Sequence, residues 1–336
     1  MNLHEAEMRL GIARRRGNPN DLASALAVHG NLLLEAGQIV EASSELEEAA
    51  NIHRVQGRPY DEARLKHLTA TLQRLQGNYD RAKQLAQTAI QLAGRGTQIS
   101  VSAYTELGEI ALAKEEIFEA FTAYDHALED SESAGLVPTG KAALGRRRAL
   151  ALVALDHHLE AAYDLIDAGK VFQEYGDSST ALRIYVEAAT ALQQGGNADL
   201  ASQLIEANIS AAQEASDNAV LADLYLLRTA FAVEQKDVAS ALVAALSARQ
   251  YALNAVAPVA YISAVVTISE LEEAVGDLIA AYESLAVGWV TLSDLLGRDV
   301  AKQIFEPKLL ALRERLGTEK FARVKVNYEA KQRTRA

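Results

Sequence analysis

The residues of this sequence that could carry chemistry are histidines, paired carboxylates and one glycine-rich turn. The adjacent histidines of DHHLE (Asp156 to Glu160) lack the one-turn spacing of the metal-binding pattern HExxH. His158 also takes an apolar position of the sequence repeat described below, so we interpret it as a structural residue. The turn GRGT (Gly94 to Thr97) lacks the lysine and the preceding strand of a phosphate-binding loop. Pairs such as Glu115–Glu116 are better explained as solvated helix surface. We therefore predict no catalytic site, no metal site and no cofactor.

Composition narrows the class of partner. The 336 residues carry a formal net charge of −12, so phosphate backbones repel the chain and nucleic acid is not expected as its ligand. The absence of cysteine excludes disulfides and thiol catalysis. The N-terminal residues are polar, and the longest apolar stretches, such as Val256 to Val266, are too short to span a bilayer. We expect a soluble, cytoplasmic protein that does not bind membranes.

The apolar content is typical of helices. Hydrophobic residues make up 49% of the chain but aromatic residues only 6%, and there are five prolines. Alanine and leucine, which favour helices, supply most of this content, whereas a sheet prefers β-branched and aromatic residues.

An internal repeat organises these helices. Segments such as GQIVEA, GNYDRA and GDLIAA recur, and their closing alanines follow one another at steps of 40, 38, 41, 40, 40 and 40 residues. These closing alanines are Ala42, Ala82, Ala120, Ala161, Ala201, Ala241 and Ala281.

Two further columns of residues share this register. Seven residues after each closing alanine lie Ala49, Ala89, Ala127, Ala168, Asn208, Ala248 and Gly288. Twelve residues before each closing alanine lie Gly30, Ala70, Gly108, Ala149, Ala189, Thr229 and Ser269. Small side chains let two helix backbones approach closely, so we expect both columns at the crossing points of helical hairpins.

These columns resemble the tetratricopeptide repeat (TPR), over roughly residues 21 to 297. The family's usual period is about 34, whereas the period here is near 40, and the family's helix A tryptophan and closing proline are mostly missing. Arrays with such a repeat are similar to the regulatory arrays of bacterial maltose-regulator-type transcription activators. The resemblance implies an all-α fold: a right-handed superhelical solenoid of about seven TPR-like helix-turn-helix repeats with terminal capping helices.

We divide the chain into three parts. Residues 1–20 are expected to form an N-terminal capping helix, residues 21–297 seven TPR-like repeats, and residues 298–336 C-terminal capping helices with a basic tail. Atypical terminal units are needed because the end of a solenoid would otherwise expose its core. The segment LGTEKF (Leu316 to Phe321) resembles the tail of bacterial signalling arrays.

The binding surface of such a solenoid is its concave face, which the first helix of each hairpin lines. The register places a basic strip on this face, formed by Asn31, Arg64, His67, Arg74, Arg146, Arg147 and Arg183. Arginine forks can bind a carboxylate through two hydrogen bonds, so an acidic peptide is one expected ligand. The other interpretation is that these arginines pair with neighbouring glutamates. The acidic residues of this face include Glu106, Glu109, Glu187 and Asp223.

Two functions fit this sequence. The first is a non-catalytic scaffold or adaptor for protein–protein interaction, which binds a peptide or helix of a partner protein in its concave groove. The alternative is a ligand- or peptide-sensing regulatory domain of a bacterial signal-transduction or transcription regulator. Open ends of repeat arrays can also pair, so the pattern is compatible with a homodimer.

Overall fold

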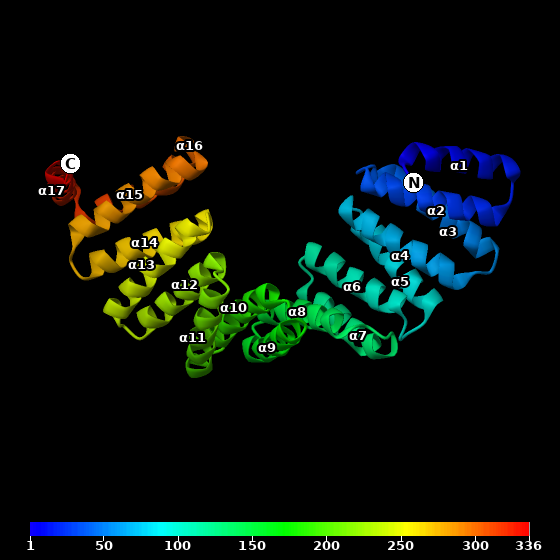
Figure 1. Ribbon diagram of the computed structural model, residues 1–336, viewed down its shortest axis with the longest axis horizontal. Helices are drawn as coiled ribbons and strands as arrows, with labels where there is room; N and C mark the ends of the chain where they lie inside the picture. Colours follow the sequence, from blue (N-terminus) through cyan, green and yellow to red (C-terminus); the bar gives the residue numbers. More distant parts are fainter. Residues whose placement is uncertain (336) are drawn as a thin grey trace. The chain divides into compact units, whose positions relative to one another are not determined.

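The computed structural model describes residues 1–335, without the side chains of residues 332, 334 and 335, and all regular structure within that range is α-helical (Figure 1). The predicted all-α fold class is therefore confirmed. Contacts within the chain divide it into two units, Met1–Tyr175 and Gly176–Ala336. This division falls between the fourth and fifth repeats, and the sequence did not predict it.

The first unit consists of a single helix followed by four hairpins. Its helices are α1 (Leu3–Arg16), α2 (Pro19–Glu35), α3 (Ile39–Val55), α4 (Pro59–Leu75), α5 (Tyr79–Ala93), α6 (Gln98–Ala113), α7 (Ile117–Ser133), α8 (Pro138–Ala154) and α9 (His158–Glu174). The second unit consists of three hairpins and two final helices. Its helices are α10 (Ser178–Gln194), α11 (Ala198–Glu214), α12 (Asn218–Glu234), α13 (Val238–Asn254), α14 (Pro258–Ala274), α15 (Leu278–Leu296), α16 (Arg298–Leu316) and α17 (Thr318–Arg335).

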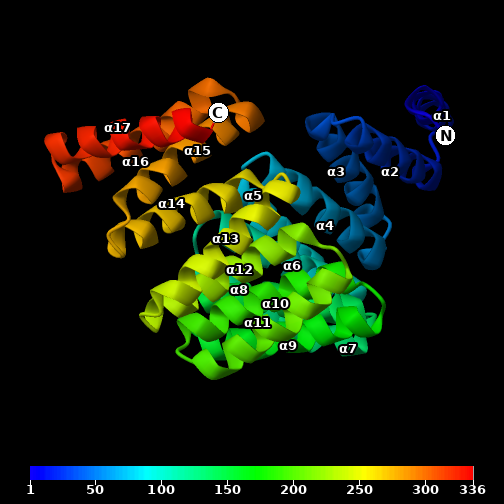
Figure 2. The ribbon, with the colours of Figure 1, turned by 60° about the vertical axis from the view of Figure 1, so that its left-hand side comes forward.

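Within each unit the helices stack in chain order (Figures 1 and 2). We call the first helix of each hairpin an A helix (α2, α4, α6, α8, α10, α12 and α14) and the second a B helix. Each A helix packs on its own B helix, and several also pack on the next A helix, such as α4 on α6. This is the packing that a helical repeat needs, because one hairpin cannot bury its own apolar face.

Short local signals begin and end the helices. Four of the five prolines are the first residues of the A helices α2, α4, α8 and α14, where the missing N–H costs no helical hydrogen bond. At six other helices an aspartate or asparagine caps the first turn, for example Asp217 Oδ1, which accepts from the Val220 N–H at 3.1 Å. Most helices end at a left-handed residue, usually glycine.

The predicted columns of small residues lie in the core. All seven closing alanines have no exposed surface, and the residues seven positions later are buried as well. The column twelve residues earlier is also buried, and it meets the closing alanines directly: Ser269 Oγ donates to the Ala281 carbonyl at 2.8 Å. The prediction that these residues mark the hairpin crossings is confirmed.

The described residues outside the seven hairpins form three helices, α1 before the hairpins and α16 and α17 after them. Helix α17 packs on both α15 and α16, and Tyr282 of α15 forms edge-to-face ring contacts with Phe321 and Tyr328. Arg335, a residue of the predicted basic tail, has its side chain outside the described part of the chain.

One helix of the described residues, α15, has the length and hydropathy of a membrane span. The search of the sequence for uninterrupted apolar runs missed it, because Glu283 and Asp294 interrupt the run. Ala281, Leu285 and Leu292 of this helix are buried, and it packs against α14, α16 and α17. In the structure α15 therefore serves as the B helix of the seventh hairpin.

Candidate functional site

The A helices of the first unit carry a row of polar side chains in which acids and bases alternate. On α4, Arg64, His67, Thr71 and Arg74 lie at spacings of three or four residues and therefore share one stripe of the helix. Glu106 and Glu109 share a stripe of α6, and Arg147 lies on α8. This row is the surface on which the sequence placed its basic strip.

Arg74 is bound to the neighbouring helix. Its Nε lies 2.5 Å from Glu106 Oε1, and Thr71 Oγ1 donates to Glu106 Oε2 at 3.0 Å. Burial alone would lower the pKa of Arg74, but the Glu106 carboxylate outweighs it and raises that pKa above its usual value. Arg74 therefore stays charged, and its charge is neutralised within the fold.

His67 is not a cation of this surface at neutral pH. Its side chain on α4 is half-buried, and this burial lowers its pKa below the usual histidine value. The Glu106 charge and a hydrogen bond to the Ser102 backbone act in the opposite direction but do not compensate. The imidazole is therefore neutral and can serve as a hydrogen-bonding group.

Glu109 joins the next two helices. Tyr124 of α7, which is fully buried, donates from its hydroxyl to Glu109 Oε1 at 3.0 Å, and Arg147 Nε lies 3.1 Å from the same oxygen. Burial and then the Glu109 charge raise the pKa of Tyr124, so the hydroxyl keeps its proton and remains a donor. We call these seven residues the polar ladder: His67, Thr71, Arg74, Glu106, Glu109, Tyr124 and Arg147.

The remaining predicted site residues fall into different surroundings. Asn31 on α2 and Arg64 on α4 are exposed, whereas Arg146 on α8 is half-buried and has an interaction partner. Arg183 is exposed on α10, in the second unit. The basic strip is thus partly neutralised: Arg74 and Arg147 pair with glutamates, as the second interpretation of the sequence expected.

The sequence did not indicate two residues that hydrogen-bond to the glutamates of this region. Thr71 and Tyr124 were not singled out, although Tyr124 lies four residues after a closing alanine and faces the small residue Gly108. It also missed Arg148, which pairs with Asp125 at 2.8 Å and with Asp164 at 2.7 Å. Arg148 thereby links α8 to both neighbouring B helices, α7 and α9, as a structural clamp.

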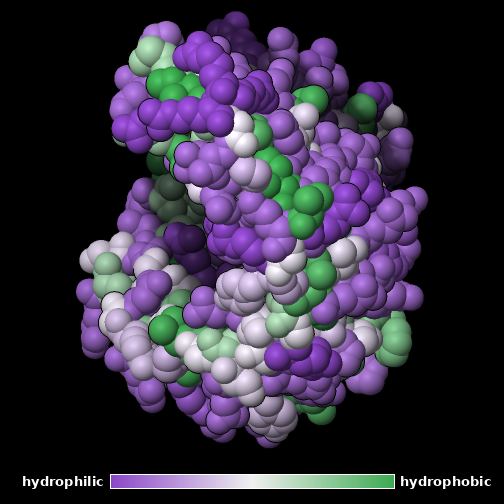
Figure 3. Space-filling view, turned by 90° about the vertical axis from the view of Figure 1, so that its right-hand side faces the viewer, coloured by the Kyte–Doolittle hydropathy of each residue, from purple (hydrophilic) through white to green (hydrophobic). Residues whose placement is uncertain are grey.

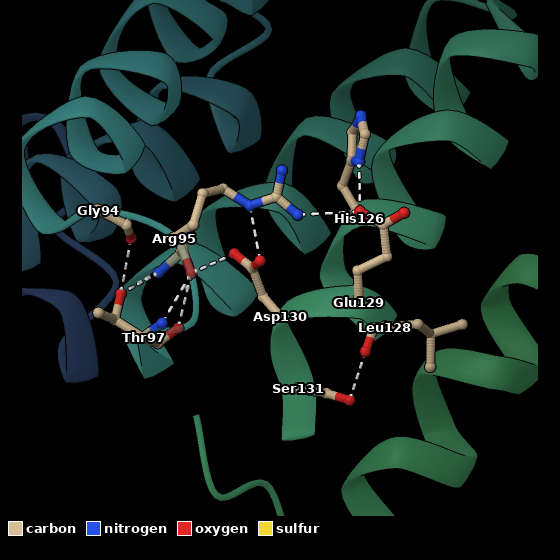
Figure 4. Close-up of polar contacts among 9 residues, drawn as sticks. Gly94, Arg95, Thr97, His126, Leu128, Glu129, Asp130 and Ser131 are labelled. Atoms are coloured by element: carbon tan, nitrogen blue, oxygen red, sulfur yellow. Dashed lines mark hydrogen bonds and ion pairs between the residues drawn. The ribbon is translucent and has the colours of Figure 1, made fainter. Parts of the chain in front are cut away.

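The glycine-rich turn GRGT is a structural turn, as predicted (Figure 4). Arg95 reaches from it to α7, where it donates to Asp130 at 2.6 Å and to Glu129 at 3.0 Å. Its guanidinium also lies 5.1 Å from the centre of the Tyr104 ring. The two acids and the ring thus hold the Arg95 side chain in place. The turn GRGT, which contains Arg95, replaces the usual shorter turn at the 38-residue step of the repeat.

The described residues contain no group of three or more histidine, cysteine or acidic side chains that could hold a metal ion. The face of the molecule that Figure 3 shows is mainly hydrophilic, with small apolar patches separated by polar surface. The arrangement on α4, α6 and α8 offers hydrogen-bond donors, acceptors and charges side by side.

The fold defines a class: stacked helical hairpins with small residues at their crossings, as in TPR proteins. A scan against protein-family models and a search of curated proteins gave no match.

Among solved structures, the apo form of RapI is similar at 13% identity and a TM-score of 0.60, over 93% of this chain and 99% of that one. A signal transduction ATPase with a tetratricopeptide repeat sensor, from Pyrococcus horikoshii, is similar at 15% identity and a TM-score of 0.64, over 85% of this chain and 44% of that one. A tetratricopeptide repeat protein from Parabacteroides merdae is similar at 16% identity and a TM-score of 0.53, over 84% of this chain and 97% of that one. At these identities the likeness concerns the fold, and a maltose-regulator-type subclass stays a prediction.

Proposed function

We propose that this protein is a non-catalytic interaction scaffold, and that the A-helix face of its first unit binds a segment of another protein. The observation that carries this proposal is the polar ladder, which holds donors and acceptors of three successive A helices in fixed positions. Side chains fixed before binding lose little conformational entropy on binding, which favours recognition of a partner.

The chemistry of the ladder points to a partner segment that presents a carboxylate among other polar groups. The ion pair of Arg147 with Glu109 uses Nε, so the Nη groups of its fork can donate to a carboxylate of the partner. Arg64 and Asn31, which are exposed on neighbouring A helices, extend the same surface. Because Glu106 and Glu109 neutralise part of the charge, we expect a single acidic group flanked by polar residues rather than a uniformly acidic peptide. Arg183 offers a separate contact on the second unit.

The test compares two charge-reversed double variants. Arg64→Glu with Arg147→Glu should weaken binding of short fluorescent peptides that carry one glutamate among serines, as measured by fluorescence anisotropy. The control, Arg54→Glu with Lys170→Glu, changes the same charge on exposed positions of the B helices α3 and α9 and should bind as the unmodified protein does. Equal binding by both variants, with unchanged circular dichroism, would contradict a role for the ladder.

The second candidate is a sensing domain of a regulator. The array of the signal transduction ATPase, whose repeats are a sensor in that protein, has this fold over 85% of the present chain. A sensor transmits binding by changing the arrangement of its parts, and this chain has two contact units that could move. Small-angle X-ray scattering with and without a bound peptide separates the candidates: an unchanged profile supports the scaffold, and a changed one supports the sensor.

A further inference from the structure

A pocket lies between two B helices of the first unit, on the side of α6 that faces away from the ladder glutamates. It has a volume of about 310 Å³ and is lined by residues of α5, α6 and α7. Tyr104, Leu107 and Ala111 line it at steps of three and four residues, and at about 100° per residue this stripe of α6 lies opposite Glu106 and Glu109. Helix α6 thus carries the ladder on one side and the floor of this pocket on the other.

The floor and one rim of the pocket are apolar. Ile110 and Ala111 of α6 and Ala123 of α7 are buried, and Leu107 is half-buried. On the α7 rim, the Phe118 ring lines the same pocket and is 64% exposed. An exposed aromatic ring beside an apolar floor gains most when another apolar side chain covers both. The pocket is therefore suited to large apolar side chains.

Ion pairs close the pocket at the starts of its two side helices. Lys114, in the turn before α7, lies with Nζ 3.6 Å from Asp80 Oδ1 of α5 and 2.9 Å from Glu116 Oε1. These contacts connect the start of α5 to the start of α7. The charges of Lys114, Asp80 and Glu116 are thereby paired within the fold.

Charged and aromatic contacts close the other end. Arg95, which follows α5, reaches α7, where Glu129 Oε2 lies 3.0 Å from both Arg95 Nη2 and His126 Nδ1 (Figure 4). The rings of Tyr104 and His126 lie 5.2 Å apart, and Arg95 lies over the Tyr104 ring. Between the two ends, the α7 wall from Phe118 to His126 is about 12 Å long at a rise of about 1.5 Å per residue. A partner element thus has room for about two helical turns of contact.

Two charges at the rims of the pocket remain available. Lys83 lies on the α5 rim and Glu119 on the α7 rim, and neither forms an ion pair with another residue of the described range 1–335. The other acid and the histidine of the pocket wall, Glu116 and His126, have partners already. A positive and a negative charge therefore lie on opposite sides of an apolar floor. A fitting partner brings an acid to the α5 side and a base to the α7 side.

We propose that this pocket docks an amphipathic helix of a partner protein, which lies along α5 and α7 with its apolar stripe on Leu107, Ile110 and Phe118. Acids on one flank of that helix pair with Lys83, and bases on the other flank pair with Glu119. A helix fits because the groove between two helices that pack on a third accepts side chains at steps of three and four residues.

The size of the site sets the expected affinity. About two turns of contact bury less surface than a standard protein interface, so we expect a dissociation constant in the micromolar range. The pocket lies on the opposite side of α6 from Glu106 and Glu109, and it does not rest on the proposed function.

The first experiment uses a fluorescein-labelled peptide of about 18 residues, long enough to be helical, with leucines along one stripe, glutamates along one flank and lysines along the other. The full chain should bind it in fluorescence anisotropy, and Phe118→Glu should weaken binding by at least about tenfold. The control is Val40→Glu on α3, which has the same place in the repeat, is 66% exposed and should bind normally. No binding by the unmodified chain, or equal binding by both variants, overturns the proposal.

The second experiment exchanges the charges at the rims. Lys83→Glu makes both rims acidic, so it should bind the mixed-charge peptide more weakly, and a peptide with lysines on both flanks more tightly, than the unmodified chain does. Adding Glu119→Lys restores one charge of each sign. Binding of the mixed-charge peptide should then return, because a helix turned end for end exchanges its two flanks. A double variant that binds this peptide no better than Lys83→Glu alone overturns the proposal.

The ladder variant Arg64→Glu with Arg147→Glu separates this site from the proposed function. It should bind the mixed-charge helix as the unmodified chain does, because its changes lie outside the pocket. Circular dichroism checks that every variant is folded. If the ladder variant loses the helix while Phe118→Glu retains it, the peptide binds at the polar ladder and the pocket is not its site.

Discussion

Gly108 shows how one small residue positions a polar contact. A Cβ atom at this position would lie 2.5 Å from Tyr124 Cε1 and 2.6 Å from Cζ, so the ring occupies the space that any side chain would need. This close approach brings the Tyr124 hydroxyl to Glu109, and Glu109 in turn holds Arg147. A residue of the repeat pattern thereby determines where two side chains of the polar ladder lie.

Replacing Gly108 with alanine tests this link. The added methyl group must displace a buried ring, so Gly108→Ala should destabilise the protein by about 1–3 kcal/mol, measured by urea unfolding. The matched control is Gly145→Ala in α8, where a Cβ meets no atom within 4 Å. There the loss of glycine flexibility should leave stability equal or raise it by about 0.5–1 kcal/mol. If both variants lose the same stability, steric contact with Tyr124 is not the cause.

A buried histidine, His53, and a half-buried one, His67, make stability depend on pH. Burial lowers the pKa values of His53 and His67, and His53 Nδ1 makes no hydrogen bond within the described residues. The unfolded chain then binds more protons than the folded one as the pH falls below about 6.5, so acidification favours unfolding. Burial raises the pKa values of Asp164, Asp223 and Glu272, so protonation of these carboxyls on acidification favours the folded state. This opposite effect on stability falls mainly at the lower pH values at which carboxyl groups titrate.

We therefore expect the melting temperature to fall between about pH 7.5 and about pH 5.5, and to fall less in a variant with His53→Gln and His67→Gln. Differential scanning fluorimetry across this range measures it. The control replaces the exposed His4 and His157 with glutamine and should follow the unmodified protein. An identical slope in both variants would show that other groups govern the pH dependence.

At the scale of elements, the turns between helices set the register of the array. Left-handed residues recur about every 20 residues, and most are glycines, which adopt this conformation without steric cost. Five are not, and Val256, with φ of 52°, is the least suited of these because its β-branched side chain crowds the backbone. The fold imposes the conformation here against the preference of the residue.

Val256→Gly should relieve this strain. A left-handed conformation costs an ordinary residue about 1–2 kcal/mol, part of which the greater freedom of glycine in the unfolded chain offsets, so we expect a gain of about 1 kcal/mol in thermal or chemical unfolding. Val275→Gly is the control, since Val275 is also exposed at a helix end but has φ of −85°. A gain in the control, or none at Val256, would contradict the strain argument.

The elements were largely predictable, and the contacts of the site were not. Seven hairpins followed from the columns of small residues because close helix crossings leave little choice of side chain. The ion pairs of Arg74 and Arg147 could not be predicted in the same way. Whether an arginine pairs with Glu106 or Glu109 depends on distances between helices more than 30 residues apart, which one helix's periodicity does not contain. Tyr124 was not predicted because it lies on a B helix, whereas the sequence analysis considered the A helices for the binding surface.

At the scale of the whole molecule, each hairpin contacts mainly its neighbours in the chain. Stability in such an array is a sum of local and nearest-neighbour contributions, so a disturbance should decline with distance along the sequence. Contacts are dense inside the units Met1–Tyr175 and Gly176–Ala336, which strengthens this expectation.

Hydrogen exchange of the full chain measures how far a disturbance travels. In Gly108→Ala we expect faster exchange in α6 and α7 and, to a smaller degree, in α5 and α8, with α12 to α15 unchanged. The Gly145→Ala protein provides the reference. Uniform acceleration along the whole chain would instead indicate that the two units unfold as one.

The recurring left-handed turns have a genetic consequence. Because most junctions present the same backbone geometry at nearly the same interval, a segment between two equivalent turns can be removed or duplicated with both ends still meeting correctly. Unequal crossing-over within the gene would then lengthen or shorten the protein by whole hairpins without breaking a helix. The turn that contains Arg95 is an exception, because the Arg95 side chain is hydrogen-bonded to Asp130 and Glu129 of the following hairpin. Removing that hairpin would therefore break these contacts.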